Sequence, residues 1–231
     1  TTACYSIGIG YSALGGAAMT GIHNIGIGGN TGAALTSGIC NIAMGHNAYA
    51  TATTGCLNVA IGSTAMGGAV TTGSDNVAIG TTAMDALTTG ARNVAIGINA
   101  YGTAAAGTDN VAIGNLAMGA SLVTGINNIA IGNSTMDALT SGICNIGIGI
   151  HALGASTTGC QNVAIGELAM GAADTTGSDN VAIGQNTMDA LTTGVNNVAL
   201  GLNALGAATT GCLNIAIGEL AMGTGVTIIG G

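Results

Sequence analysis

The chain has 231 residues, of which 48% are hydrophobic and only 4% are charged, and its formal net charge is −8. Nucleic-acid binding is not expected, because phosphate contacts need clustered Lys and Arg and Arg92 is the one basic residue of the chain. Membrane insertion is not expected either, because Gly, Asn or Thr interrupts every apolar run well before the roughly 18 residues needed to span a bilayer.

Near-copies of Asn-Val-Ala-Ile-Gly recur along the chain at intervals of 17, 17 and 18 residues, so three copies make a block of 52 residues. A repeat this short cannot bury a face alone and must stack on its neighbours. We therefore expect an all-β fold, a parallel β-solenoid of about thirteen coils, as a single array over residues 1–231. Residues 1–5 would be a partial coil and residues 6–231 the thirteen coils, with Ser6 in place of the first asparagine. The start in mid-repeat indicates a segment of a longer array.

An asparagine opens each later coil, just beyond a predicted corner. Its amide is expected to hydrogen-bond the turn and the same amide one coil away, which makes a structural ladder. The alternative is a column of ligand-binding amides. The residues are Asn24, Asn41, Asn58, Asn76, Asn93, Asn110, Asn128, Asn145, Asn162, Asn180, Asn197 and Asn214.

The Val-Ala-Ile triplet after each asparagine is predicted to be a short strand. If Val and Ile fill the interior, the alternating Ala faces outward on a strand that is apolar on both sides. We expect this small-residue face to be buried against other copies of the chain, although simple exposure is the alternative. The predicted self-association face consists of Ala60, Ala78, Ala95 and Ala112.

The rest of each coil is predicted to hold two glycine corners and a second extended segment that runs from Ala-Met to Thr-Thr. Both the glycine that ends the motif, such as Gly80, and the glycine three residues before the next asparagine, such as Gly90, are expected to need positive φ. The methionines of the second segment are adaptable core fillers. Every third coil carries its extra residue in one place, as a bulge.

The cysteines lie on neighbouring coils in two places, as Cys40 with Cys56 and as Cys144 with Cys160. Such diagonal neighbours are within plausible reach of the Cα separation that a disulfide needs. Bridges within or between chains and free buried thiols both stay open, and a bridged pair would indicate an oxidising compartment.

No catalytic, metal-binding or cofactor-binding residues are predicted, and the chain is not expected to be an enzyme. His23, His46 and His151 occupy different repeat positions, so they specify no catalytic set. Asp85, Asp137 and Asp189 recur, but three coils at about 4.8 Å each separate them by roughly 14 Å, too far for a carboxylate pair. These three are expected to be solvated corner residues.

The units Asn-Val-Ala-Ile-Gly-x-x-Ala-Met and Thr-Thr-Gly-x-x-Asn-Val-Ala-Ile-Gly resemble the head repeats of trimeric autotransporter adhesins. They are still more similar to repeats of phage tail fibres and large bacterial surface proteins, and the resemblance covers essentially the whole chain. It implies a parallel β-roll fibre, outside the cell on a cell surface or virion, that supports adhesion or acts as a spacer shaft. The implied partners are copies of the chain, three around an axis, and a host surface or extracellular matrix. No binding residues carry over.

Two alternatives belong to other classes. One is an end-to-end self-assembling extracellular filament or sheath subunit. The other is an ice-binding solenoid, suggested by the Thr or Ser that precedes most corner glycines, although adjacent strand residues point to opposite faces and leave one outward rank. The residues of this column are Thr20, Ser37, Thr54, Thr72, Thr89, Thr124, Ser141, Thr158, Thr176, Thr193 and Thr210.

Overall fold

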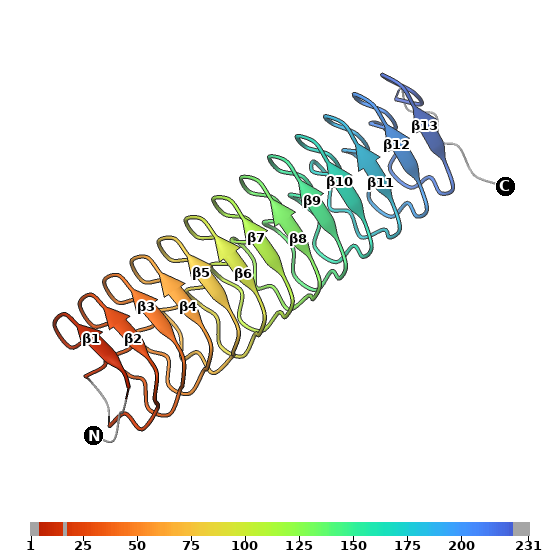
Figure 1. Ribbon diagram of the computed structural model, residues 1–231. Coiled ribbons are helices and arrows are strands. Elements are labelled where there is room, and N and C mark those ends of the chain that lie inside the picture. Colours follow the sequence, from red (N-terminus) through yellow and green to blue (C-terminus); the bar gives the residue numbers. More distant parts are fainter. Residues whose placement is uncertain (1–4, 16–17, 224–231) are drawn as a thin grey trace. The chain divides into compact units, whose positions relative to one another are not determined.

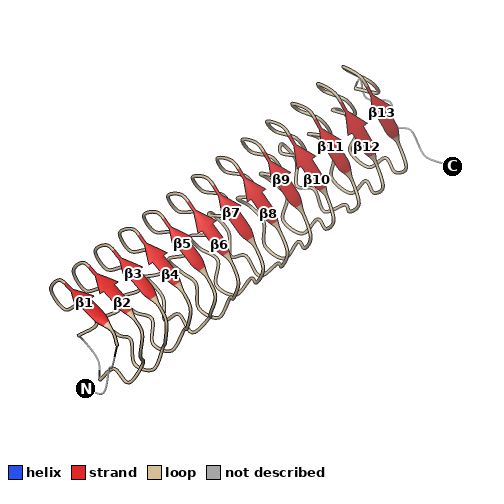
Figure 2. Cartoon of the chain, viewed as in Figure 1, coloured by secondary structure: helices blue, strands red, loops and turns tan. Residues whose placement is uncertain are grey.

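The computed structural model describes residues 5–15 and 18–223, in two compact units, residues 1–124 and 125–231. In each unit the described residues form a parallel β-solenoid that contains strands and turns but no helix (Figures 1 and 2). The all-β solenoid predicted from the repeat is therefore confirmed. Apart from Tyr5, the predicted partial coil lies outside the described residues, as does the end of the last coil from residue 224 onward.

The first unit has one three-residue strand in each of its coils. Neighbouring strands pair in parallel and in chain order, residue for residue, so that Val59 lies beside Val77 and Ile61 beside Ile79. The strands are β1 (Ile7–Ile9), β2 (Ile25–Ile27), β3 (Ile42–Met44), β4 (Val59–Ile61), β5 (Val77–Ile79), β6 (Val94–Ile96) and β7 (Val111–Ile113).

The second unit repeats this arrangement. Its strands also pair in parallel with the same register, for example Val163 beside Val181. They are β8 (Ile129–Ile131), β9 (Ile146–Ile148), β10 (Val163–Ile165), β11 (Val181–Ile183), β12 (Val198–Leu200) and β13 (Ile215–Ile217).

A glycine follows every strand because the chain turns there with positive φ. Gly80 has a φ of 138°, and a Cβ built on it would lie 2.4 Å from the carbonyl oxygen of Gly97 in the next coil. Side chains are thus excluded by conformation and by close approach together. The predicted positive φ of the motif glycine is confirmed from Gly10 to Gly218.

The predicted second extended segment is wrong, because the residues after the corner form turns. Thr64 and Met66 both adopt left-handed backbone, with φ of 54° and 50°, which reverses the chain instead of extending it. Their amides still bond neighbouring coils. The Thr64 N–H donates to the His46 carbonyl at 2.9 Å, and the Met66 N–H donates to the Ala83 carbonyl at 2.9 Å.

The glycine three residues before each asparagine also differs from its prediction. Gly90 does not have positive φ; the left-handed residue at this corner is Arg92, with a φ of 55°. A Cβ on Gly90 would lie 2.4 Å from the Gly107 carbonyl oxygen and 2.7 Å from Leu87 Cδ1. This glycine is required because coils approach closely here, and not because of its dihedral angles.

Long side chains from the turns fill the interior of each unit. Met66, Met84 and Met118 in the first unit, and Met136 and Met188 in the second, are all completely buried. Their predicted role as core fillers is confirmed. The unbranched thioether suits this narrow interior, which buried alanines of the strands also line.

The predicted orientation of the strands is wrong, and the self-association face must be corrected. Ala60, Ala78, Ala95 and Ala112 are at most 1% exposed and face the interior. The opposing turns leave little room there: a Cβ added to Gly147, the equivalent of these alanines in β9, would lie 3.0 Å from Met136 Cε. Only Ala or Gly fits beneath the strand, so the flanking Val and Ile point outward.

Candidate interaction surface

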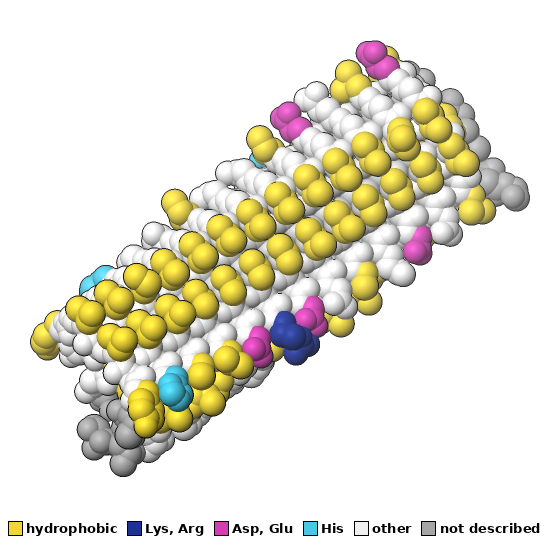
Figure 3. Space-filling view, viewed as in Figure 1, with side chains coloured by type: hydrophobic (Ala, Val, Ile, Leu, Met, Phe, Trp, Pro, Cys, Tyr) yellow, Lys and Arg dark blue, Asp and Glu magenta, His cyan; other side chains and the backbone are white. Residues whose placement is uncertain are grey.

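Two rows of apolar side chains cover the outside of each unit's sheet, and Figure 3 shows them in yellow. We call them the outer rows; they consist of the first and third residues of every strand. Most members are partly exposed, and Ile96, Ile131 and Ile183 exceed a third. In the first unit they are Ile7, Ile25, Ile42, Val59, Val77, Val94 and Val111 with Ile9, Ile27, Met44, Ile61, Ile79, Ile96 and Ile113; in the second, Ile129, Ile146, Val163, Val181, Val198 and Ile215 with Ile131, Ile148, Ile165, Ile183, Leu200 and Ile217.

The outer rows contain only Val, Ile, Met and Leu, so no side chain in them donates a hydrogen bond or carries charge. In-register pairing repeats each side chain at the strand spacing of about 4.8 Å. Between the rows lies backbone alone, since the middle residue of each strand faces inward. The arrangement is suited to dry contact with another apolar surface and supplies no group for acid–base or nucleophilic chemistry.

The asparagines form a buried column in each unit. In the first unit, Asn24 Nδ2 donates to the Gly38 carbonyl at 2.8 Å. Its Oδ1 accepts from the backbone N–H of Asn41 at 2.9 Å and from Asn41 Nδ2 at 3.0 Å. The same pattern recurs in the second unit, where Asn180 Oδ1 accepts from the N–H and the Nδ2 of Asn197, both at 3.0 Å. These amides bond protein groups on neighbouring coils and are buried away from solvent ligands.

Two tyrosines modify the column in the first unit. The Asn58 Nδ2 donates to the Tyr49 hydroxyl at 2.8 Å, and Asn110 Nδ2 donates to the Tyr101 hydroxyl at 2.8 Å. Burial raises the pKa of both phenols well above its ordinary value, so they stay neutral and accept these bonds. Both rings replace a Met or Leu of the interior.

The described cysteines are free thiols. Cys40 and Cys144 are exposed, whereas Cys56, Cys160 and Cys212 are half-buried. The Ile39 N–H lies 3.4 Å from Cys56 Sγ, which places this thiol against the coil that carries Cys40. Intrachain bridges between Cys40 and Cys56 or between Cys144 and Cys160 are thus not formed in the structure, and a bridge between chains stays a prediction.

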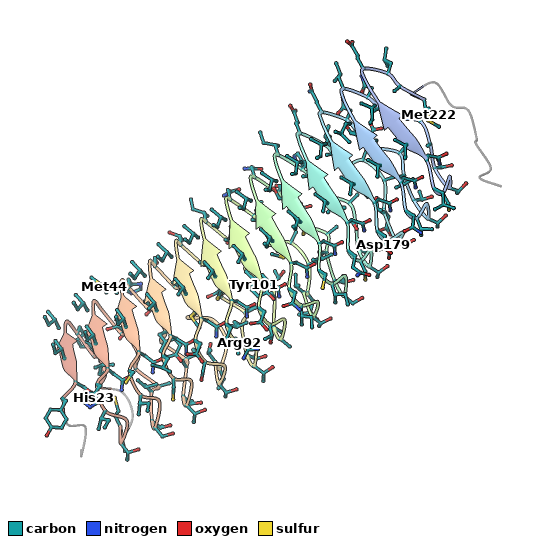
Figure 4. The ribbon with its side chains drawn as sticks, turned by 45° about the vertical axis from the view of Figure 1, so that its right-hand side comes forward. His23, Met44, Arg92, Tyr101, Asp179 and Met222 are labelled. Carbon is teal, nitrogen blue, oxygen red and sulfur yellow. The ribbon has the colours of Figure 1, made fainter. Side chains whose placement is uncertain are left out.

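The single arginine lies at an exposed corner, labelled in Figure 4, away from the strands. Arg92 Nε and Nη2 donate to the two carboxylate oxygens of Asp109 at 2.7 and 2.9 Å. This hydrogen bonding lowers the pKa of Asp109 and raises that of Arg92, to which the Asp75 charge also contributes. The basic charge is neutralised within its own column of corner residues.

The recurring aspartates are more buried than the sequence predicts. Asp85 packs against Gly68 of the preceding coil, and its Oδ1 is buried without a hydrogen-bond partner among the described atoms. Burial raises the pKa of Asp85, Asp137 and Asp189 above the ordinary range. They are corner residues as expected, but they are half-buried, so their solvation is partial.

The remaining candidate residues lie apart. His23 is exposed and stacks on Tyr5 with ring centroids 5.2 Å apart, and His46 and His151 are exposed in different units. Within residues 5–15 and 18–223, no group of three or more His, Cys, Asp or Glu could hold a metal ion. In the same described part of the chain, no helix is long and apolar enough to cross a membrane.

The threonine column stands at the surface as one rank. Thr54, Thr72 and Thr89 are exposed, whereas the threonine before each is less exposed. Thr71 Oγ1 donates to the Leu87 carbonyl and Thr88 Oγ1 to the Ala105 carbonyl, each at 2.9 Å. The first hydroxyl of these two pairs is therefore bonded to the next coil, and the exposed Thr72 hydroxyl also donates, to the Thr88 carbonyl at 3.3 Å.

Comparison with known proteins identifies no relative. No family model matches the sequence, and neither a curated protein nor a solved structure matches it.

Proposed function

We propose that the chain is a non-enzymatic structural β-solenoid that serves as the shaft or adhesin scaffold of an extracellular, cell-surface or virion fibre. The observation that carries the proposal is the asparagine column, since its amides hydrogen-bond coil to coil throughout each unit. The role is mechanical: the protein holds its form and spaces other parts.

The hydrogen-bond pattern supports a load-bearing role. Each coil is joined to the next by strand backbone, by turn backbone and by the asparagine amide, as for Val77 with Asn93 and for Asn76 with Gly90. Separating two coils breaks these bonds together, because all of them join the same two coils. Structures of this kind resist local opening, since the free energy of opening rises with the number of bonds lost at once.

The proposed location outside the cell rests on the resemblance of the repeat to phage fibres and adhesin heads. The proposed partners are copies of the chain and a host surface or extracellular matrix. Nucleic acid is not among them, because Arg92 is paired with Asp109 and nine acidic residues oppose phosphate.

Immunogold electron microscopy of the native source material tests this proposal. Antibodies raised against the full chain are expected to label fibres outside the cell or on virions, with label repeated along their length. Preimmune antibodies provide the control. Label confined to the cell interior, without a fibre, would contradict the proposed function.

Ice binding is a second candidate, favoured by the exposed rank that contains Thr54, Thr72 and Thr89. A single rank offers fewer matched contacts than a two-rank surface. Thermal hysteresis of the purified chain decides the matter: a freezing point depressed below the melting point would support ice binding, and no gap at millimolar concentration would exclude it.

A further inference from the structure

We propose that the outer rows are an interface with the same rows of a second copy of this chain, packed sheet on sheet. The inference rests on the proposed structural function and assigns its self-association to a surface. That surface is opposite to the one that the sequence pattern predicts.

The outer face of each unit's sheet has no covering layer among the described residues. Parallel sheets occur almost only with both faces covered, and their strands are then apolar throughout. Here the inner face is covered by Met84, Met118 and the other interior side chains, and the outer face carries Val, Ile, Leu or Met at every position. A parallel strand that is apolar on both sides indicates a covering layer, and residues 5–15 and 18–223 of one chain do not supply it.

The repeat of the outer rows indicates what the covering layer is. Side chains of the outer rows repeat once per coil, so an occupant that contacts all of them alike needs the same repeat along its length. A second copy has the same repeat because it has the same sequence. Its rows fit beside these rows, over the backbone strip that separates them, at the separation of about 10 Å typical of stacked sheets.

Charge does not oppose this contact. Although the net charge is −8, the acidic residues lie at corners and turns and none lies in the outer rows. The acidic residues of the turns are Asp85, Asp137, Asp174 and Asp189, those that precede asparagines are Asp75, Asp109 and Asp179, and those that directly follow a corner glycine, beyond the end of the outer rows, are Glu167 and Glu219. Two copies therefore meet through uncharged surface and keep their acidic groups in water.

The area that each unit offers is enough for a weak, concentration-dependent contact. A strip from asparagine to corner glycine is about 13 Å wide, so each coil contributes roughly 60 Å² at a strand spacing of about 4.8 Å. Each unit then offers roughly 400 Å² per partner, which is in the range of weak interfaces, so pairing is expected to depend on concentration.

The test is sedimentation equilibrium of the full chain over a wide concentration range. The unchanged chain is expected to have the mass of two chains of 21.7 kDa. A face variant carries Ile79→Lys, Ile96→Lys and Ile113→Lys in the first unit, and Ile148→Lys, Ile165→Lys and Ile183→Lys in the second. It is expected to be a single chain wherever the unchanged protein is a pair, because the introduced cations of the two copies would face each other across the interface.

A matched control places the same number of charges on the threonine rank, as Thr54→Lys, Thr72→Lys, Thr89→Lys, Thr158→Lys, Thr176→Lys and Thr193→Lys. It is expected to stay a pair. If the face variant does not fold, as judged by circular dichroism, a gentler variant with Val59→Thr, Val77→Thr and Val94→Thr keeps side-chain shape and should raise the dimer Kd at least tenfold.

Several results would overturn the inference. They are a single chain at all concentrations, a three-chain particle, a face variant that still pairs, or equal dissociation of the control. Binding of a monomeric chain to phosphatidylcholine vesicles through the outer rows would assign the face to lipid. Fibre labelling of a chain that is monomeric in solution would refute this inference alone and leave the proposed function standing.

Discussion

The side-chain amide of each asparagine in the column joins several groups on neighbouring coils. Asn76 Nδ2 donates to Asn58 Oδ1 at 3.1 Å and to the Gly90 carbonyl at 3.0 Å, and its Oδ1 accepts from the backbone N–H of Asn93. All of these groups are buried, so none regains a partner from water when the amide is removed.

Replacing Asn76 with Ala should therefore lower the free energy of unfolding by about 3 kcal/mol, since several buried donors and acceptors lose their partners at once. Guanidinium unfolding followed by circular dichroism measures the change. Gln185→Ala removes an exposed amide and should alter stability by less than about 0.5 kcal/mol. Equal effects of the two substitutions would show that the column contributes little.

The half-buried aspartates give the protein a pH dependence with a defined sign. Burial raises the folded-state pKa of Asp85 and Asp189 above the ordinary value of 3.8. A carboxyl with a raised folded pKa contributes its stability fully below the unfolded pKa and loses it as pH rises through the folded pKa. We expect these residues to make the solenoid less stable as pH rises from about 4 toward neutrality.

The variant Asp85→Asn with Asp189→Asn should melt at a higher temperature than the unchanged chain at neutral pH, and the difference should vanish near a pH of about 4. Thermal melts at a series of pH values measure this. Asp179→Asn changes an exposed carboxylate and is the control. A difference between variant and unchanged chain that does not depend on pH would contradict the assignment.

Among the elements, the corner after each strand has the strictest steric requirement. Gly80→Ala would place a Cβ 2.4 Å from the Gly97 carbonyl oxygen at a φ of 138°. We expect a loss of about 3 kcal/mol in unfolding free energy. Gly29→Ala, at a turn position where other coils carry His46 or Ser63, should be neutral or slightly stabilising. Similar losses from both would refute the steric explanation.

The left-handed turn residues make a second prediction at this scale. Leu168 has a φ of 55° and is partly exposed, whereas Leu205 has a φ of 51° and is buried. Asparagine tolerates left-handed backbone better than leucine, so Leu168→Asn should stabilise the protein by about 0.5 kcal/mol. Leu205→Asn should destabilise it, because the polar amide enters the core. Denaturant midpoints of the two variants should move in opposite directions.

Some of this architecture is predictable from sequence, and some is not. The period of the asparagines determines the coil length and the strand positions, because a short repeat must stack in register. Alternation within a triplet such as Val77-Ala78-Ile79 cannot tell which face is inside, since both faces are apolar. The deciding factor is the bulk of Met84 and its equivalents across the narrow interior, which leaves room only for alanine or glycine.

The left-handed turn conformation could not be predicted from the sequence for a related reason. Thr64 and Met66 are ordinary residues for an extended segment, and Met has no preference for positive φ. Tertiary packing imposes that conformation, because the turn must direct Met66 inward while its N–H bonds the next coil. A pattern that depends on neighbouring coils is not visible in one coil's residues.

At the scale of the whole molecule, hydrogen bonds between coils hold each unit together as a stack. Amide hydrogen exchange of the full chain, read residue by residue, tests this most directly. We expect the slowest exchange at amides that donate to the next coil, such as those of Ile42, Val59 and Val77 in one unit and Ile146 and Val181 in the other. Exchange at these positions as fast as at the exposed corner residues would contradict it.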